Sequence, residues 1–246
     1  SDRELVELAI QTLGLRSVQP FEPEKKIIEW AIRKEDILVS KKVGSFVDIV
    51  SSDSPAPGGG SVAALAGALG SALAAMDANL TVGKKGYEGF YEELSALGLK
   101  AQKLKKALLE LVDEDTAAFN AVMDAMRLPK STEAEKRARD VAIETANKEA
   151  ASVPLKTSRF CLEAMRLCLE AARTGNSNSA TDAATGCLMA WAGLSGAVLN
   201  VRINIKTLSD EQFTCEARKE CDYLETEAAQ LRMELEKSIL GILGLR

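Results

Sequence analysis

The chain has 246 residues, of which 46% are hydrophobic and 4% aromatic, and it carries a formal net charge of −5 with no histidine. The length allows one large domain or a domain with an appendage, and the scarcity of aromatic residues favours helices over strands. The negative charge disfavours nucleic acid as the main partner. The lack of histidine excludes imidazole bases and histidine-based zinc sites, so proton transfer must use Asp, Glu, Lys, Tyr, Cys or water.

Two short helices are predicted in the first 40 residues. One covers residues 2–13 and ends at Gly14, and Pro23 suits the first turn of another that runs to about residue 33. The charged stretch 34–42 is typical of a linker, so we expect a helical appendage over 1–40 and a main domain over 41–246. The chain starts at Ser1 without Met and shows no signal peptide, which favours a piece of a longer protein. Its odd number of cysteines, with no CxxC spacing, is typical of a cytoplasmic protein.

A proline- and glycine-rich turn follows a short predicted helix over residues 45–51. Gly58, Gly59, Gly60 and Ser61 open into a helix over 62–80, where small residues recur every four positions. Such rows let another backbone approach closely, so we expect a central helix and a subunit contact through it. Its many Ala and Gly residues, together with Asp77, disfavour a membrane span. The turn itself has two interpretations. Either its glycines let the backbone lie close to an anionic or carbonyl group of a ligand, or it is simply a tight turn that precedes a closely packed helix.

The remaining elements are all predicted to be helices. A helix over residues 91–126 stops before Pro129, and Thr132 with Glu135 forms a capping box for the next, which Pro154 should break or kink. That segment ends before residue 175. Further capping boxes are predicted at the starts of a helix over 181–201 (Ser179 with Asp182) and of a last long helix (Ser209 with Gln212). The pattern predicts an all-α multi-helix bundle with long antiparallel helices.

Several polar side chains stand where chemistry is plausible. Asp115 lies on an apolar stripe, four residues from both Leu111 and Phe119, so its carboxylate is either paired in a structural contact or has a raised pKa. Asn200 and Asn204 lie one turn apart on one helical face, and they either bind a ligand or each other across an interface.

Two further polar clusters are open to two interpretations. Asn176 and Asp182 belong to a crowded polar turn, where they are either site residues or simple helix caps. Lys84 and Lys85 follow the small-residue helix, where they form either an anion-binding site or an ordinary exposed loop. The five cysteines include no CxxC pair, which predicts reduced thiols that act as small buried hydrophobes.

Several blocks, taken together, resemble the formiminotetrahydrofolate cyclodeaminase / methenyltetrahydrofolate cyclohydrolase family. They occur in the family's order within residues 44–240, at 55–64, 81–88, 115–119, 127–130, 151–154, 175–176, 181–182 and 200–206. Residues 1–33 resemble the tail of a glutamate formiminotransferase domain, without its catalytic core. Asp77 and Arg202 depart from the more apolar residues of the family.

The resemblance implies closure of 5-formiminotetrahydrofolate to 5,10-methenyltetrahydrofolate with release of ammonia, as a lyase of histidine degradation and one-carbon metabolism. It implies Asp115, and after it Asp182, as the catalytic proton donor, and either acid could instead accept hydrogen bonds from the pterin edge. It implies that the folate is bound by Gly58, Gly59, Gly60, Ser61, Asn176, Asn200 and Asn204. Lys84 and Lys85 are implied to bind its glutamyl tail, which can be polyglutamylated. It implies no metal and no redox cofactor, a homodimer, and fusion to or association with a glutamate formiminotransferase. The alternatives are hydrolysis of methenyltetrahydrofolate to 10-formyltetrahydrofolate, and a non-catalytic helical oligomerisation module.

Overall fold

The computed structural model describes residues 2–17, 21–26, 37–242 and 244, and it divides into two units, Ser1–Lys42 and Val43–Arg246. In the first unit, α1 covers Asp2–Thr12 and is followed by Gly14 at φ 62°, in agreement with the predicted glycine end. The helix α2 covers Pro23–Lys26, and the predicted continuation to residue 33 lies outside the described residues. A 3₁₀ turn, η1 (Leu38–Ser40), occupies part of the predicted linker.

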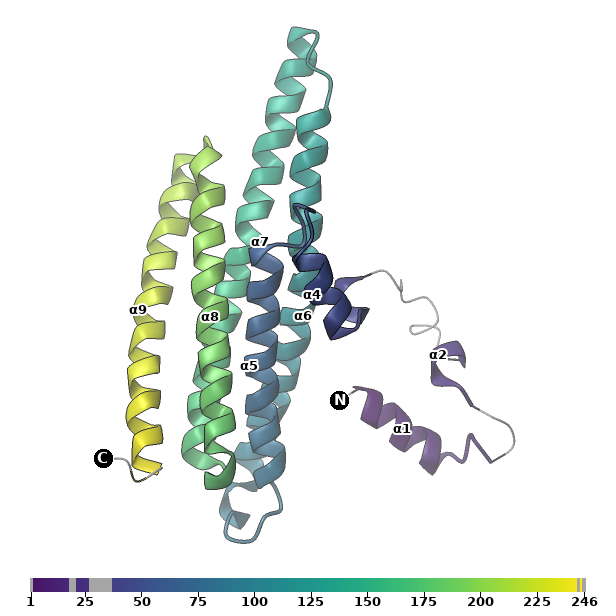
Figure 1. Ribbon diagram of the computed structural model, residues 1–246, viewed down its shortest axis with the longest axis vertical. Helices are drawn as coiled ribbons and strands as arrows, with labels where there is room; N and C mark the ends of the chain where they lie inside the picture. The colour runs from purple at the N-terminus through teal and green to yellow at the C-terminus, as the bar shows by residue number, and fades with distance from the viewer. Residues whose placement is uncertain (1, 18–20, 27–36, 243, 245–246) are drawn as a thin grey trace. The chain divides into compact units, whose positions relative to one another are not determined.

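The second unit is a bundle of long helices that run alternately up and down (Figure 1). A short helix, α4 (Val43–Val50), precedes α5 (Gly59–Thr81), and the 3₁₀ turn η2 (Glu88–Phe90) leads into α6 (Tyr91–Arg127). The chain then returns through α7 (Glu133–Thr174), the turn η3 (Ser177–Ser179) and α8 (Ala180–Asn204). The turn η4 (Ile205–Thr207) joins α8 to α9 (Glu211–Ile242). The described residues contain no β-strand, so the predicted all-α fold with long antiparallel helices is confirmed.

The small-residue helix α5 is the centre of this bundle, packed against α6, α7 and α8. Its glycines bring two backbones into contact, because a Cβ on Gly70 would lie 2.6 Å from the carbonyl oxygen of Gly186 on α8. A Cβ on Gly193 of α8 would likewise lie 2.6 Å from the carbonyl oxygen of Ala63. The rows of small residues therefore act as predicted, and larger side chains would push α5 and α8 apart.

Of the predicted break or kink at Pro154, the break does not occur. Pro154 lies inside α7, which continues from Glu133 to Thr174. A proline has no N–H, so the carbonyl of Ala150 loses its usual helical donor. The side-chain amide of Asn204 donates to that carbonyl instead, at 2.6 Å. The replacement bond and the buried apolar face after residue 154 compensate for the lost helical bond.

Of the three predicted capping boxes, only that of Thr132 with Glu135 is confirmed, with both reciprocal hydrogen bonds present. The box of Ser179 with Asp182 is wrong, because Ser179 ends a 3₁₀ turn and its hydroxyl donates to the carbonyl of Asn176 at 3.0 Å. A different bond satisfies the backbone there, so the capping geometry is not adopted.

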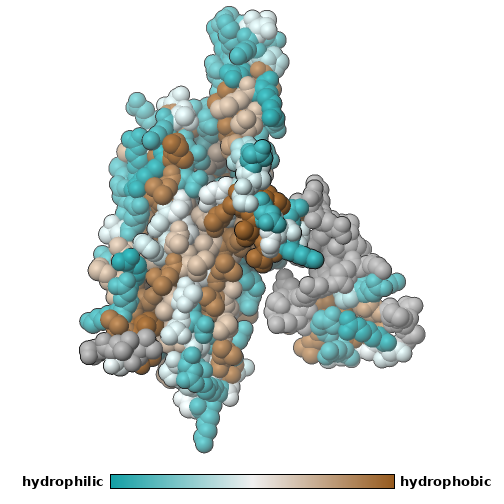
Figure 2. Space-filling model, in the orientation of Figure 1, coloured by the Kyte–Doolittle hydropathy of each residue, from teal (hydrophilic) through white to brown (hydrophobic). Residues whose placement is uncertain are grey.

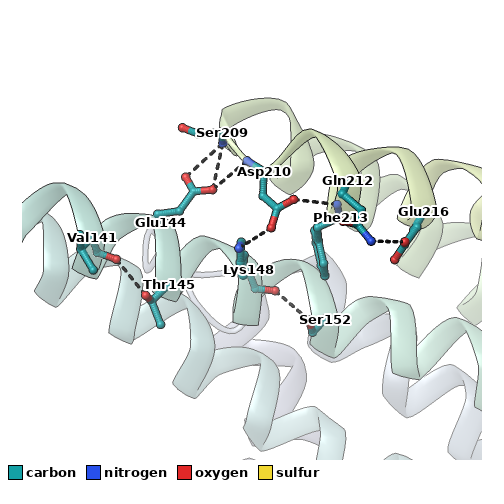
Figure 3. A network of polar contacts seen from close by, with 10 residues as sticks. All are labelled: Val141, Glu144, Thr145, Lys148, Ser152, Ser209, Asp210, Gln212, Phe213 and Glu216. Atoms are coloured by element: carbon teal, nitrogen blue, oxygen red, sulfur yellow. Dashed lines mark hydrogen bonds and ion pairs between the residues drawn. The ribbon is translucent and has the colours of Figure 1, made fainter.

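The predicted cap of the last helix, Ser209 with Gln212, is also wrong. Asp210 caps α9 instead, because its carboxylate accepts from the backbone N–H of Phe213 at 2.9 Å (Figure 3). The backbone N–H groups of Ser209 and Asp210 both donate to Glu144 of α7, at 3.0 and 3.1 Å. The start of α9 is therefore fixed to α7 by a tertiary contact, which a local capping pattern does not reveal.

Four of the five cysteines are buried, as predicted, and Cys215 is exposed, so the prediction is wrong for that residue. Burial raises the pKa of Cys161 and of Cys187 to about 12, which keeps both thiols protonated. These side chains fill gaps between helices as small apolar groups.

Two stretches, Gly59–Thr81 and Ser177–Thr207, are long and apolar enough to cross a membrane by length and composition. About half of each is buried within the bundle, 56% and 44% of the most apolar window. Asp77 lies in the first stretch and Asp182 in the second, as expected for core helices of a folded bundle rather than for spans.

Candidate active site

A pocket of about 310 Å³ opens where α5 begins and the α6–α7 hairpin leaves the bundle (Figure 1). The volume is at the lower end of that of small-molecule sites. Six of the residues singled out from sequence line it together: Gly58, Gly59, Gly60, Asp115, Asn200 and Asn204. They come from the first turn of α5 and its N-cap residue, from α6 and from the end of α8. Residues far apart in the chain thus meet in one concave, polar site.

Asp115 is the only carboxylate that lines this pocket within the described residues. Burial raises its pKa, and bonds from the hydroxyl and backbone N–H of Ser61 partly oppose this rise by favouring the carboxylate. The Ser61 hydroxyl lies 3.0 Å from Oδ2 of Asp115. A Cβ on Gly60 would overlap the carboxylate, so the acid can occupy its place only beside a glycine. The result is an acid that holds its proton to a higher pH than usual and faces a cavity.

The positive end of α5 is satisfied by the chain itself. Gly58 is the N-cap residue and has no side chain to cap the helix, and the carboxylate of Asp115 reaches across from α6 to the N–H of Ser61. Ser61 is fully buried, with its hydroxyl also 2.9 Å from the carbonyl oxygen of Val112. The structure therefore places Ser61 behind the pocket wall, where it orients Asp115, and leaves Gly58, Gly59 and Gly60 at the surface of the cavity.

The two asparagines of α8 each use the amide nitrogen to bind a backbone carbonyl. Nδ2 of Asn200 lies 2.8 Å from the carbonyl oxygen of Gly196, and Nδ2 of Asn204 lies 2.6 Å from that of Ala150. Within the chain, neither asparagine binds the other. Asn147, one turn before Ala150 on α7, also lines the pocket.

A network of charged groups braces α7 behind this wall (Figure 3). Lys148 pairs with Asp210 at 2.7 Å, and this contact lowers the pKa of Asp210. With Glu144 bound to the backbone of Ser209, these contacts hold the start of α9 against the segment of α7 that carries Asn147. The network fixes the place of the pocket wall and does not itself face the cavity.

The other predicted site residues lie at the opposite end of α5. Lys84 and Lys85 follow its last turn, and the backbone N–H of Asn176 donates to the Thr81 hydroxyl at 2.9 Å. The Asn176 side chain is engaged locally, because Oδ1 accepts from the backbone of Asn178 at 3.1 Å. A helix of 23 residues is about 35 Å long. A single chain therefore does not bring Lys84, Lys85, Asn176 and Asp182 into the pocket.

A second buried acid, Asp77, lies among these residues. It is fully buried, and burial raises its pKa, although the nearby polar groups of Ser179, Thr81 and the backbone of Asn176 act to lower it. The charge of Asp182 raises the pKa of Asp77 further. In the described part of the chain, no group hydrogen-bonds to Oδ2 of Asp77. This acid is closed off from solvent, unlike Asp115.

Comparisons with known proteins identify the family. A family model described as Formiminotransferase-cyclodeaminase matches residues 42–223, and one described as Formiminotransferase domain matches residues 1–33. The chain belongs to the formiminotransferase-cyclodeaminase family. The resemblance found in the sequence is thereby confirmed.

Two curated relatives show the range of this family. Methenyltetrahydrofolate cyclohydrolase of Methylorubrum extorquens is 40% identical over 200 residues, which are 81% of this chain and 96% of the relative. Formimidoyltransferase-cyclodeaminase of Gallus gallus is 36% identical over 228 residues, which are 92% of this chain and 42% of the relative. The chain thus spans less than half of the length of the chicken protein.

A solved structure has the same fold. Formiminotetrahydrofolate cyclodeaminase from Thermotoga maritima superposes with a TM-score of 0.74 at 32% identity, and the match covers 82% of this chain and 98% of that one. The formiminotransferase-cyclodeaminase family is thus a family of folate enzymes, with both cyclodeaminases and a cyclohydrolase among the relatives of this chain.

Some pocket residues of this family member were not predicted from the sequence. Asn147, Phe119 and Val122 line the cavity. Asn147 gave no signal because a polar residue on a charged helix is typical of an exposed face, and Phe119 had been assigned to the core stripe. Within the described residues, no three Cys, Asp or Glu side chains gather closely enough to hold a metal ion.

Proposed function

We propose that this chain closes 5-formiminotetrahydrofolate to 5,10-methenyltetrahydrofolate and releases ammonia. We place this reaction in the cytoplasm, as part of one-carbon metabolism and of histidine degradation. The observation that carries the proposal is Asp115, a cavity-facing acid whose pKa burial raises, beside a turn of three glycines. The match of residues 1–33 to a formiminotransferase domain supports the deaminase, because such a domain, alone or fused, handles the formimino group. The substrate is a folate, which can be polyglutamylated.

The reaction needs a proton to move between two nitrogens. N10 of the folate attacks the formimino carbon on N5, which gives a tetrahedral carbon bearing both nitrogens and an amino group. The C–N bond to the amino group then breaks, ammonia leaves, and a cationic methenyl bridge joins N5 and N10. Counted from the protonated, cationic formimino group, N10 loses one proton, the leaving amine gains one, and the positive charge passes to the methenyl bridge, so no metal and no redox step is required for the balance.

Asp115 is our proton carrier for this step. A single carboxyl group can give its proton to the leaving amine and regain one from N10, provided that both nitrogens lie within hydrogen-bonding reach. A raised pKa suits this role because the group is then protonated at a pH closer to neutrality. The Ser61 bonds hold the carboxyl group in one orientation, so its proton is directed at one point of the cavity.

The second candidate is hydrolysis of methenyltetrahydrofolate to 10-formyltetrahydrofolate. It is favoured by the 40% identity to a cyclohydrolase that this chain matches over 96% of its length. Incubation with each substrate separates the two: ammonia release with appearance of the methenyl absorbance supports the deaminase, and loss of that absorbance from added methenyltetrahydrofolate supports the cyclohydrolase. If neither substrate is bound or converted, the chain is a non-catalytic oligomerisation module.

We further propose a homodimer that completes the site. Exposed apolar side chains recur along the outer face of α5 at Val62, Leu69 and Met76, and along α8 at Leu199 and Ile203. Figure 2 shows apolar surface running down the face that these two helices present. An apolar face of this extent is typical of a subunit contact. A two-fold axis across α5 would set the two copies of this helix antiparallel.

This arrangement also accounts for the split site. It would bring the Lys84, Lys85, Asn176 and Asp182 end of one α5 beside the glycine end of its partner. The test is to mix equal amounts of Asp115→Asn and Asp182→Asn protomers and to unfold and refold them together. We expect about a quarter of the wild-type activity to return, because half of the dimers are mixed and each of these has one intact site of two. Leu69→Glu should yield monomers by light scattering, whereas the matched control Val141→Glu on the hairpin should remain dimeric.

A further inference from the structure

The wall of the pocket contains a backbone carbonyl that Pro154 leaves without a helical partner. In an α-helix the carbonyl of residue 150 accepts from the N–H of residue 154, and proline has none. Asn204 supplies the missing donor from α8, with Nδ2 at 2.6 Å from the oxygen of Ala150. Both Ala150 and Asn204 line the pocket, so this contact lies in the wall itself.

The contact determines which way the Asn204 amide points. A carbonyl oxygen only accepts hydrogen bonds, so the NH₂ group must face Ala150 and the side-chain oxygen must point elsewhere. The reverse orientation would place two oxygens against each other and leave the Ala150 carbonyl unpaired, at the expense of one hydrogen bond.

Asn200 is oriented in the same sense but less firmly. Its Nδ2 binds the carbonyl of Gly196, four residues earlier in the same helix, which also receives the helical bond from the backbone N–H of residue 200. The Gly196 carbonyl therefore keeps a partner when Asn200 turns away. Asn204 has no such freedom, because only its amide replaces the donor that Pro154 lacks.

We infer that Pro154 is a positioning residue that fixes Asn204 with its oxygen as a hydrogen-bond acceptor for the substrate. The Asn204 oxygen in the pocket wall then selects a ligand edge that carries N–H donors. This inference rests on the proposed function, because the reduced pterin of the folate has such an edge in its amino group and ring N–H. It deepens that function by stating which partner donates the hydrogen bond, the ligand, and which accepts it, Asn204. It also makes Pro154, in the middle of α7, a determinant of substrate specificity.

The test is a double-mutant cycle on the full chain, read out by titration with 5-formyltetrahydrofolate, which has an oxygen in place of the leaving amine. Pro154→Ala gives residue 154 an N–H that competes for the Ala150 carbonyl and frees the amide. We expect Kd and KM to rise about fivefold, the worth of one neutral hydrogen bond, with kcat nearly unchanged. In an Asn204→Ala background the same change should have no further effect on Kd. In an Asn200→Ala background it should keep its full effect.

Thermal unfolding of the same variants measures the contact independently. Asn204→Ala should lower Tm by leaving the Ala150 carbonyl unpaired, and adding Pro154→Ala should restore Tm by supplying the helical donor. Equal effects of Pro154→Ala on Kd with and without Asn204, or no effect at all, would overturn the inference while folate binding by the wild type stands. If the wild-type chain binds no 5-formyltetrahydrofolate, the proposed function fails and the assigned recognition fails with it, whatever the Tm values show.

Discussion

Replacing Asp115 by asparagine removes the transferable proton and keeps the shape of the side chain. The amide oxygen can still accept from the hydroxyl and backbone N–H of Ser61, so the start of α5 should remain capped. General acid–base catalysis by a positioned group contributes roughly 10²–10⁴ in rate. We therefore expect kcat of Asp115→Asn to fall by that factor, which corresponds to about 3 to 5 kcal/mol of transition-state stabilisation.

The same substitution should not destabilise the fold. Burial raises the pKa of Asp115 above its unfolded value, so the charged form is less favourable in the folded chain than in the unfolded one. For a carboxyl group with a raised pKa, this penalty is present at pH above the folded pKa and disappears as the pH falls below the unfolded pKa. The Tm of Asp115→Asn should thus equal or exceed that of the wild type at pH 8, with the difference shrinking towards pH 4.

The assay is ammonia release from 5-formiminotetrahydrofolate, measured as kcat between pH 5 and 9 alongside melting curves. A matched control is Asp124→Asn, an exposed carboxylate of the same helix with 74% of its side chain accessible. The wild-type kcat should decline on the alkaline side, as the proton donor ionises, and the control should follow the wild type. Activity of Asp115→Asn within about threefold of the wild type would refute the assignment, since it would leave no room for the rate factor of a general acid.

Two more substitutions probe the buried acids. Gly60→Ala places a methyl group where the carboxylate of Asp115 lies and should abolish most activity, with a loss of roughly 1–3 kcal/mol in stability from overpacking. Gly44→Ala, whose Cβ would meet no atom within 4 Å, is the control, and equal effects of the two would contradict the close contact. Asp77→Asn should be more stable than the wild type at pH 8 by on the order of 1 kcal/mol, because burial raises the pKa of Asp77. Chemical unfolding should show this gain vanish towards pH 4, and a gain that does not vary with pH would contradict a charge-based origin.

The site could be predicted in part because the features that mark it are local. Asp115 was found by its place on an apolar stripe, and Asn200 with Asn204 by their spacing of one turn. Whether these side chains come together with Gly58 depends on the positions of α6 and α8 along the axis of α5. That register is set by contacts such as Gly70 on Gly186, which no local pattern contains. Sequence reasoning therefore found the members of the site without their geometry.

The failures have the same physical origin. The caps assigned to Ser179 and Ser209 assumed that a helix end uses the nearest side chain, but Glu144, more than sixty residues away, binds the backbone at Ser209. Asp182 was grouped with Asp115 because both are acids in family-like blocks, but the two lie at opposite ends of the central helix in one chain. Only a contact between subunits can bring the two side chains together, and a single sequence does not predict which surfaces form such a contact.

The two acids with raised pKa differ in their surroundings, because Asp115 is half-buried and lines the pocket while Asp77 is fully buried. Each lies against a glycine, Gly60 for Asp115 and Gly175 for Asp77, whose Cβ would overlap the carboxylate. Asp115 meets the N-terminal end of α5, where the helix dipole favours negative charge and opposes the effect of burial.

Asp77 lies in the last turn of the same helix, where the exposed carbonyls disfavour negative charge, and Asp182 adds a like charge. Burial raises the pKa of both acids and hydrogen bonds oppose this rise at both, whereas a neighbouring like charge adds to it only at Asp77. Of these two acids, Asp115 lines the pocket and Asp77 is enclosed, so Asp115 is the one placed to meet a ligand.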